Sequence, residues 1–202
     1  MLAVETGMAP LVRDLFGGAI KAVIPAGAKD VSEIREIPDN QEVFCHPATD
    51  QSIMIDVLEY QSHVHGEQAV RYHFDDIASS NETMDNYEVV KIEPIPMEKL
   101  SMKQCSDAWL LRGRQLVSKF KEGNEAKNVV EMSLALFRLP QYSTDIVVTF
   151  NNPTYISQSS SSCKSVSSGS ADSSSTWTEE TFYFSVTSLS LVKPELLFGE
   201  NT

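Results

Sequence analysis

The stretch that decides the fold is REIPDNQEVFCHPATDQSIMIDVLEYQ, which runs from Arg35 to Gln61. Its last part, residues 52–60, alternates as a β-strand does, because successive side chains of a strand point to opposite faces. The two faces would carry Ile53, Ile55 and Val57 on one side and Met54, Asp56 and Leu58 on the other. We therefore predict a largely buried strand, preceded by a tight turn at Pro38-Asp39-Asn40, whose residue types favour turns.

Further strands are predicted on both sides of this stretch. The apolar or alternating patterns lie at residues 19–24, 87–96, 109–120, 128–140, 144–151 and 181–192. The last of them depends on the alternation of Phe182, Phe184 and Val186. Residues 65–81 instead have helical spacing, with a helix ending near Asn81 that packs on the sheet. Several strands with few helices, and no regular alternation of the two, indicate the α+β class.

Three segments are expected to lie outside this regular structure. Residues 1–14 are predicted to be a flexible N-terminus before a single domain, 15–202. Twelve of the twenty residues 157–176 are serine, a composition that cannot bury enough apolar surface to order itself. A disordered serine-rich insertion is therefore predicted at about 154–176. The step Gly123-Asn124 is predicted to be a turn.

Composition limits the classes of function. The chain has 202 residues, 42% of them hydrophobic, which suits one domain with a real core. Its 16 basic and 28 acidic residues give a net charge of -12, which would repel nucleic acids and anionic membranes. No apolar run reaches the ~18 residues of a membrane-spanning helix. Three cysteines without CxxC spacing indicate reduced thiols in a cytosolic or nuclear protein.

The sequence gives only weak evidence for an enzymatic site or a metal site. Cys45 and His46 are adjacent, so in an extended segment they point to opposite faces and the histidine is poorly placed to activate the thiol. His63 and His65 have the spacing of strand metal ligands, but the sequence offers no obvious third ligand and a solvated loop is favoured. No P-loop or GxGxxG motif is present, so we expect no cofactor and no metal.

Acidic density is the most informative local feature. Residues 30–67 hold nine carboxylates against a single arginine, Arg35, and so carry -8 of the net charge of -12. Like charges so close repel one another unless something cationic is present. Composition alone favours a solvated acidic face over a binding site. A pair of carboxylates for hydrolysis is a third reading, disfavoured because no aromatic cluster for substrate accompanies them.

Several separate blocks of the sequence carry a family resemblance. They are LFGGAIKAVIP at 15–25, IPDNQEVFCHPATDQS at 37–52, YHFDDIA at 72–78, RLPQYSTDIVVTFNNP at 138–153 and VTSLSLVKPELLFG at 186–199. Together they resemble the Mog family of Ran guanine nucleotide release factors over residues 15–153 and 182–199. The resemblance is interrupted at the serine run and does not include the first fourteen residues.

The resemblance implies both a fold and a function. The fold is that shared with the photosystem protein PsbP, an antiparallel sheet sandwiched between helices. The function is binding of the small GTPase Ran and release of its guanine nucleotide, without covalent chemistry, which influences nuclear transport. The protein is expected to be a monomer in the nucleus and cytoplasm. In vertebrates the family is also linked to surface delivery of the cardiac voltage-gated sodium channel through a cytoplasmic loop, with peripheral association at the plasma membrane.

The resemblance also implies a set of Ran-binding residues around the PDNQEVF block. They are Asp30, Asp39, Asn40, Gln41, Glu42 and Asp50. The sequence leaves open whether a Ran-binding cofactor protein assists and whether the serine run is phosphorylated. The alternative function that the sequence leaves open is that of a non-catalytic adaptor or trafficking protein, which binds Ran or a channel loop without accelerating nucleotide exchange.

Overall fold

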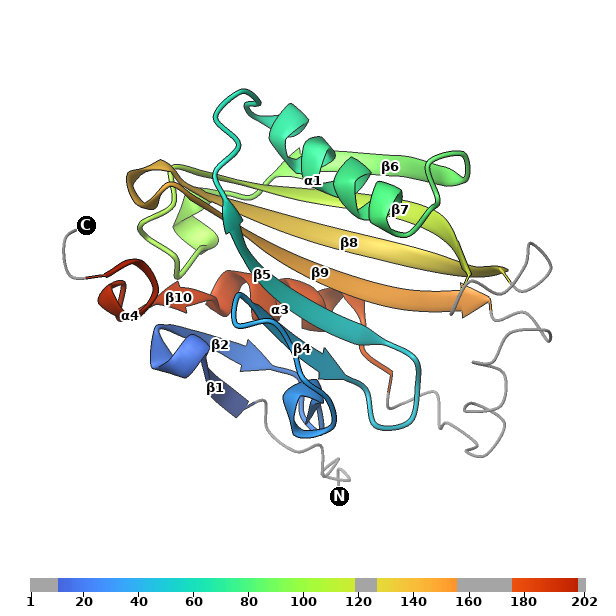
Figure 1. The fold of residues 1–202 in the computed structure, drawn as a ribbon, viewed down its shortest axis with the longest axis horizontal. Helices are drawn as coiled ribbons and strands as arrows, with labels where there is room; N and C mark the ends of the chain where they lie inside the picture. The colour runs from blue at the N-terminus through green and yellow to red at the C-terminus, as the bar shows by residue number, and fades with distance from the viewer. Residues whose placement is uncertain (1–10, 119–126, 156–175, 200–202) are drawn as a thin grey trace, which may run out of the picture.

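A large antiparallel sheet forms the centre of the structure (Figure 1). The computed structural model describes residues 11–118, 127–155 and 176–199. The strand order of the large sheet is β3-β4-β5-β9-β8-β7-β6. The bounds are β3 Lys29–Asp30, β4 Gln41–Cys45, β5 Ser52–Glu59, β6 Tyr87–Pro94, β7 Asp107–Ser118, β8 Lys127–Leu139 and β9 Thr144–Tyr155. The strands predicted at 52–60, 87–96, 109–120, 128–140 and 144–151 are thus confirmed.

A smaller sheet and several helices complete the fold. The small sheet has the order β1-β2-β10, with β1 Leu11–Leu15, β2 Ile20–Ile24 and β10 Ser190–Leu191. The helices are α1 Glu67–Ser80, α3 Glu179–Ser188 and α4 Glu195–Phe198. Short 3₁₀ turns are η1 Phe16–Gly18, η2 Val31–Glu33, η3 Met97–Lys99 and η6 Pro140–Tyr142. The strand predicted at 19–24 and the helix predicted within 65–81 are confirmed as β2 and α1.

The two faces of the large sheet bury separate hydrophobic cores. On one face, α1 packs its buried Val70 and Phe74 against strand residues such as Leu134. On the other face, α3 and the small sheet cover the strands, and the rings of Phe182 and Phe150 stack with centroids 5.6 Å apart. The large sheet therefore lies between helices, as Figure 1 shows, which confirms the predicted α+β fold.

Close packing of α1 requires a glycine on β7. A Cβ added at Gly113 would overlap the Phe74 ring and would lie 2.8 Å from the Glu88 carbonyl oxygen. Real Cβ atoms do not approach backbone so closely, so a side chain here would push the helix off the sheet. Gly113 thus sets the distance between α1 and the sheet.

The predicted strand at 181–192 is wrong, because most of this segment is the helix α3. Phe182 and Val186 lie four residues apart and are both fully buried, whereas Phe184 between them is 54% exposed. A strand would have placed all three on one face, but the helix turns Phe184 outward. Thr178 caps the N-terminus of the helix, since its hydroxyl accepts a hydrogen bond from the Thr181 N–H at 3.2 Å in a capping box. Only residues 190–191 form a strand, β10.

The predicted flexible N-terminus is also corrected in part. Residues 11–14 belong to β1, which pairs with β2 in the register Leu11 to Ile24. Pairing supplies the backbone hydrogen bonds that the sequence pattern of this short segment did not reveal. Residues 1–10, the turn predicted at Gly123-Asn124 and residues 156–175 of the predicted serine-rich insertion lie outside the described residues. Residues 154 and 155, at the predicted start of this insertion, belong to β9.

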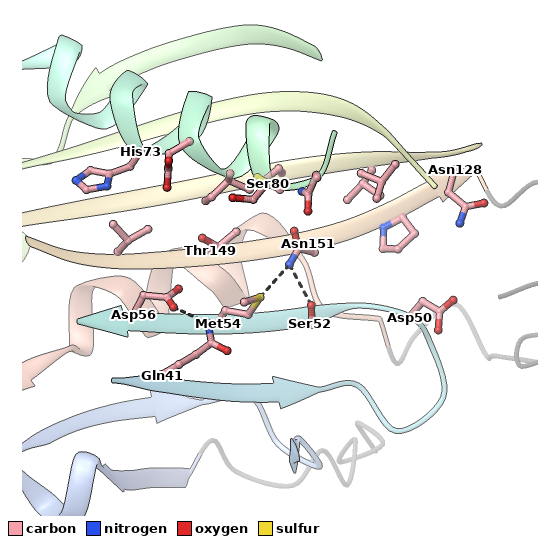
Figure 2. Close-up of a pocket in the computed structure, with 18 of the residues that line it drawn as sticks. Gln41, Asp50, Ser52, Met54, Asp56, His73, Ser80, Asn128, Thr149 and Asn151 are labelled. Atoms are coloured by element: carbon pink, nitrogen blue, oxygen red, sulfur yellow. Dashed lines mark hydrogen bonds between the residues drawn. The ribbon is translucent and has the colours of Figure 1, made fainter. Parts of the chain in front are cut away.

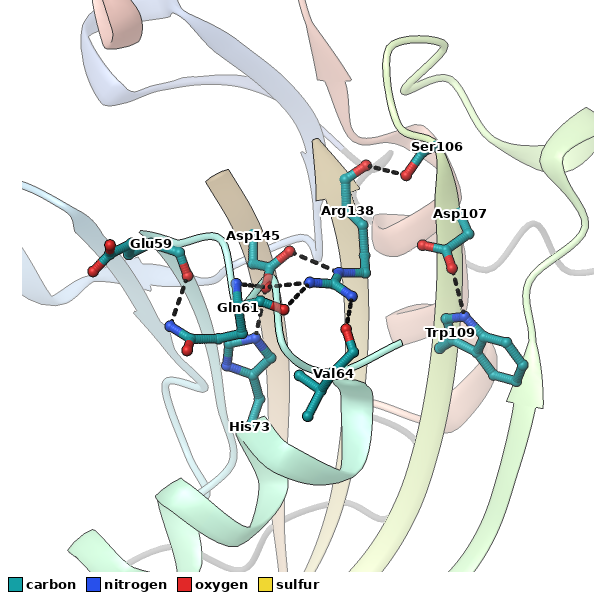
Figure 3. A network of polar contacts seen from close by, with 9 residues as sticks. All are labelled: Glu59, Gln61, Val64, His73, Ser106, Asp107, Trp109, Arg138 and Asp145. Carbon is teal, nitrogen blue, oxygen red and sulfur yellow. Dashed lines mark hydrogen bonds and ion pairs between the residues drawn. The ribbon is translucent and has the colours of Figure 1, made fainter. Parts of the chain in front are cut away.

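A buried ionic network fixes the loop between β5 and α1 to the end of the sheet (Figure 3). Arg138 is 2% exposed and its Nε donates to Asp145 Oδ1 at 3.1 Å, while His73 Nε2 lies 3.1 Å from Asp145 Oδ2. Arg138 also donates to the carbonyl oxygens of Gln61 and Val64. The buried pair of Arg138 and Asp145 thereby holds β8, β9, α1 and the loop before α1 in a single arrangement.

Candidate functional site

The six residues that the resemblance implies as Ran-binding lie along the β3–β4 side of the large sheet and its connecting loops. We call this set, Asp30, Asp39, Asn40, Gln41, Glu42 and Asp50, the acidic edge. Asp39 and Asn40 occupy the turn before β4, and Asp50 lies in the loop after it. β4 has five residues, so about 16 Å of strand separates that turn from that loop. The structure does not gather all six into one point.

The turn that presents Asp39 is held by backbone bonds. Gln41 N donates to Pro38 O at 2.9 Å and Val57 N donates to Asn40 O at 2.9 Å. Asn40 Nδ2 in addition donates to Val57 O at 3.1 Å. The Asn40 side chain is therefore a structural clamp on β5, while Asp39 beside it is exposed. A rigid, exposed carboxylate of this kind is suited to a cationic partner because binding orders little.

Asp30 serves a local structural role. Its Oδ1 accepts hydrogen bonds from Ser32 N at 2.8 Å and Ser32 Oγ at 2.6 Å. These bonds cap the 3₁₀ turn η2, so the carboxylate is already partly engaged.

Gln41 and Glu42 point to opposite faces of the sheet, as neighbours in a strand must. Glu42 accepts a hydrogen bond from Phe16 N at 2.6 Å and so ties β4 to η1. Burial raises the pKa of Glu42, the Phe16 N–H opposes this, and the nearby Asp30 raises it further. Gln41 instead points to the α1 side, where its Nε2 donates to Asp56 Oδ1 at 2.6 Å. The sequence had grouped these two residues as one surface.

A groove of about 470 Å³ lies on that α1 side, between β5, β9 and β8 below and the C-terminal half of α1 above (Figure 2). Two residues of the acidic edge, Gln41 and Asp50, line it near opposite ends. Its apolar lining is formed by Met54, Leu58, Ile77, Val117, Val130, Met132, Val147 and Pro153. We call this the β5–α1 groove. The sequence did not predict it, because β9 and α1 must first come together to form its walls.

Asp56 is the residue of this groove that sequence reasoning missed as a site candidate. Burial raises its pKa, and the hydrogen bond from Gln41 and the charge of His73 only partly oppose this. Among the described residues it makes no ion pair with a lysine or arginine. The sequence signal for Asp56 was the alternation of β5, which places this carboxylate between Met54 and Leu58 on one face of the strand.

The histidines considered as candidate bases or ligands lie in two separate loops. His46 is buried, its Nδ1 accepts from Ala48 N at 3.1 Å, and its ring contacts Trp177 edge-on. His63 and His65 lie exposed in the loop before α1. Within residues 11–118, 127–155 and 176–199, no cluster of three or more metal-ligating side chains occurs. No helix in these ranges is both long and apolar enough to cross a membrane.

The chain matches one protein-family model and several named proteins. The family model described as "Ran-interacting Mog1 protein" matches residues 13–153. The Ran guanine nucleotide release factor of Danio rerio is 57% identical over 152 residues, covering 74% of this chain and 82% of the relative. The human protein of the same name is 42% identical over 186 residues, covering 92% and 95%.

A yeast protein is similar to this chain in sequence, and a yeast crystal structure is similar to it in fold. The Saccharomyces cerevisiae nuclear import protein MOG1 is 30% identical over 151 residues, covering 69% of this chain and 65% of that protein. The crystal structure of the Saccharomyces cerevisiae Ran-binding protein Mog1p superimposes with a TM-score of 0.67 at 22% identity, over 94% of this chain and 98% of the other. At that identity the superposition establishes the fold.

Proposed function

This chain belongs to the Mog1 family of Ran-interacting proteins, and from that premise we propose that it binds the GTPase Ran and promotes release of Ran's guanine nucleotide. Its place of action would be the nucleus and cytoplasm, in nuclear protein transport, in keeping with the name of the yeast relative. The protein would act as a binding regulator, with no covalent step.

One observation carries the proposal for this chain. The acidic edge ends in an exposed turn, and two partly buried carboxylates, Glu42 and Asp56, lie on the neighbouring strands without a lysine or arginine partner among the described residues. Burial disfavours the charged form of both groups, so a cationic partner would gain more here than at a fully solvated carboxylate. A basic surface on Ran is the matching partner.

Nucleotide release follows from a difference in affinity between two states of Ran. Lysines of Ran that contact the nucleotide would instead pair with carboxylates of the acidic edge. The regulator would then bind nucleotide-free Ran more tightly than nucleotide-bound Ran, and by linkage it would weaken nucleotide binding by the same factor. The test is the rate at which a fluorescent guanine nucleotide leaves Ran when this protein is added.

An adaptor role is the alternative that this test separates. A protein that binds Ran and leaves the nucleotide off-rate unchanged would be an adaptor. The sodium-channel role, a peripheral place at the plasma membrane, an assisting Ran-binding cofactor protein and the monomeric state stay predictions of the family resemblance.

Association with Ran should depend on salt. Oppositely charged surfaces steer encounters, and ions screen this attraction over a Debye length of about 10 Å at 0.1 M salt. We expect the association rate constant to fall about tenfold or more between 50 and 500 mM NaCl, while the dissociation rate changes much less. Stopped-flow measurement of both rates checks this. An association rate that does not change with salt would refute steering by the acidic edge.

A further inference from the structure

We propose that a second groove of this protein binds an extended, proline-containing peptide segment of a partner protein, which carries one basic and one acidic side chain. The groove lies beside α3, on the face of the large sheet opposite α1, and has a volume of about 860 Å³. One wall is the outer side of α3, the other is formed by residues 93–96 and Lys99, and Leu110 and Arg112 on β7 form the floor. We call it the α3–β6 groove.

The side of α3 that faces the groove carries two neighbouring aromatic residues. Four residues of the helix line the groove at positions i, i+3, i+4 and i+7, the spacing of a single helix face: Glu180, Tyr183, Phe184 and Thr187. Phe182, which the helix buries in the core, turns the other way. Phe184 is 54% exposed. This face of α3 is therefore an apolar surface that the described residues leave open at Phe184.

The opposite wall favours an extended peptide. Pro94 and Pro96 line it, and β6 is the last strand in the described sheet order, so its outer edge is open. Ile95 N donates to Ala108 O on β7 at 2.8 Å, so the neighbouring Pro94 turns its carbonyl oxygen to that open edge. A peptide N–H can donate to it there. Aromatic-lined grooves are also where polyproline II segments dock, because these segments are extended before they bind.

An ionic network fixes the walls of the groove. Arg112 Nη1 lies 2.7 Å from Glu93 Oε1, and its Nε lies 3.3 Å from Glu179 Oε2. Ser133 Oγ donates to Glu179 Oε1 at 2.7 Å. The first turn of α3 is thereby bound to β7 and β8, and β7 to the end of β6. Peptide binding would order little of a groove that is already formed.

Two opposite charges of the lining make no ion pair among the described residues. They are Glu180, on the first turn of α3, and Lys99, on η3. The Lys99 ammonium lies 6.0 Å from the centroid of the Tyr183 ring, which belongs to the next turn of α3. A peptide with a basic side chain at Glu180, an acidic side chain at Lys99 and apolar residues between them would match both charges.

The α3–β6 groove is separate from the acidic edge. In the sheet order, β4 and β7 are four strand spacings apart, which is about 19 Å. A peptide in the groove would therefore leave the acidic edge free for Ran. This inference does not depend on the proposed function, since the groove would bind its peptide whether or not the protein binds Ran.

The first test is an NMR titration of the isotope-labelled protein with a blocked five-residue peptide, which has arginine first, glutamate last, and proline, leucine and proline between. At millimolar concentration it should shift the amide signals of Lys99, Phe184 and Thr187 and leave that of Asp39 unchanged. The same peptide with glutamine at both ends should bind about fivefold more weakly, because two exposed ion pairs are lost. Absence of shifts at the groove, or equal affinity of the two peptides, would overturn the proposal.

A charge reversal tests the role of Glu180. Wild-type protein should prefer the arginine peptide to a peptide with glutamate at both ends. Glu180→Lys should invert this preference, because the new ammonium would pair with the added glutamate. A general loss of structure would weaken both peptides alike and could not invert their order. A Glu180→Lys variant that keeps the wild-type preference would contradict the assignment of this end of the groove.

Phe184→Ala tests the apolar wall. Affinity for the arginine peptide should fall about tenfold, since the peptide would no longer cover the ring, and the Tm should change little because Phe184 is largely exposed. Tyr155→Ala is the matched control: it removes an aromatic side chain that is 57% exposed at the end of β9, outside the groove, and should leave peptide affinity unchanged. Equal peptide affinity of the two variants would refute the proposal. A dimer in sedimentation that Phe184→Ala dissociates would make a second copy of the chain the occupant instead.

Discussion

Asp145→Asn is expected to lower the free energy of unfolding by about 3–5 kcal/mol, the usual cost of removing one partner of a buried ion pair. Asparagine keeps the shape of the side chain but leaves Arg138, which is 2% exposed, as an uncompensated buried cation. The loss should also loosen the loop before α1, because Arg138 holds the carbonyl oxygens of Gln61 and Val64. Urea unfolding at neutral pH measures the effect.

Two comparisons make this test specific. Asp14 pairs with Lys21 at 3.2 Å on the surface, and Asp14→Asn should cost about 1 kcal/mol or less. Burial alone would raise the pKa of Asp145, but the hydrogen bonds from His73, Arg138 and Gln61 N outweigh it and the pKa is lowered. Its stabilising contribution is therefore full above the pKa of an unfolded aspartate and is lost as pH falls through the lowered folded value. Equal losses for Asp145→Asn and Asp14→Asn would contradict the network.

Asp39→Lys is expected to reduce Ran affinity by about 30-fold or more, which corresponds to about 2 kcal/mol or more. The carboxylate lies on a turn fixed to β5. Reversing its charge would place a lysine against the basic surface of Ran that we propose as its partner. Because Asp39 is exposed, stability should change little. Calorimetric titration with Ran, together with a thermal scan of each variant, separates the two effects.

Glu67→Lys is the matched control for this charge reversal. Glu67 is exposed at the start of α1, outside the acidic edge and outside the groove, and the same change of charge should alter Ran affinity by less than about fivefold. Glu42→Lys should weaken Ran binding at least as much as Asp39→Lys, but it removes the hydrogen bond to Phe16 N and should lower the Tm as well. Equal Ran affinity of the three variants would rule out this ranking.

Most strands of the large sheet could be predicted because their apolar residues stand at the positions that the fold buries. β5 and β9 have residues buried on one or both faces, and α1 has its helical apolar spacing, so local sequence and burial agree. The α3 segment was predicted wrongly because the alternation of Phe182, Phe184 and Val186 fits a strand. The capping box at Thr178 and the burial of Phe182 and Val186, four residues apart, instead stabilise a helix. The pattern allowed both, and tertiary packing selected one.

The candidate site was predictable only in those parts whose interactions join residues close together in the chain. The turn at Asp39 and the cap at Asp30 depend on residues next to them in the chain. The β5–α1 groove depends on pairing between Met54 and Thr149, which are far apart in sequence, and on the packing of α1 over them. A single sequence gives no such pairing, so Asp56 appeared as one more acidic residue and Thr149 as part of a strand.

The rate of nucleotide release from Ran tests the central claim most directly. Ran loaded with a fluorescent guanine nucleotide would be mixed in a stopped-flow instrument with excess unlabelled nucleotide and increasing amounts of this protein. The account predicts that the release rate rises with wild-type protein and with Glu67→Lys, and stays near the intrinsic rate with Asp39→Lys. A release rate that wild-type protein leaves unchanged at concentrations where Ran is bound would contradict it.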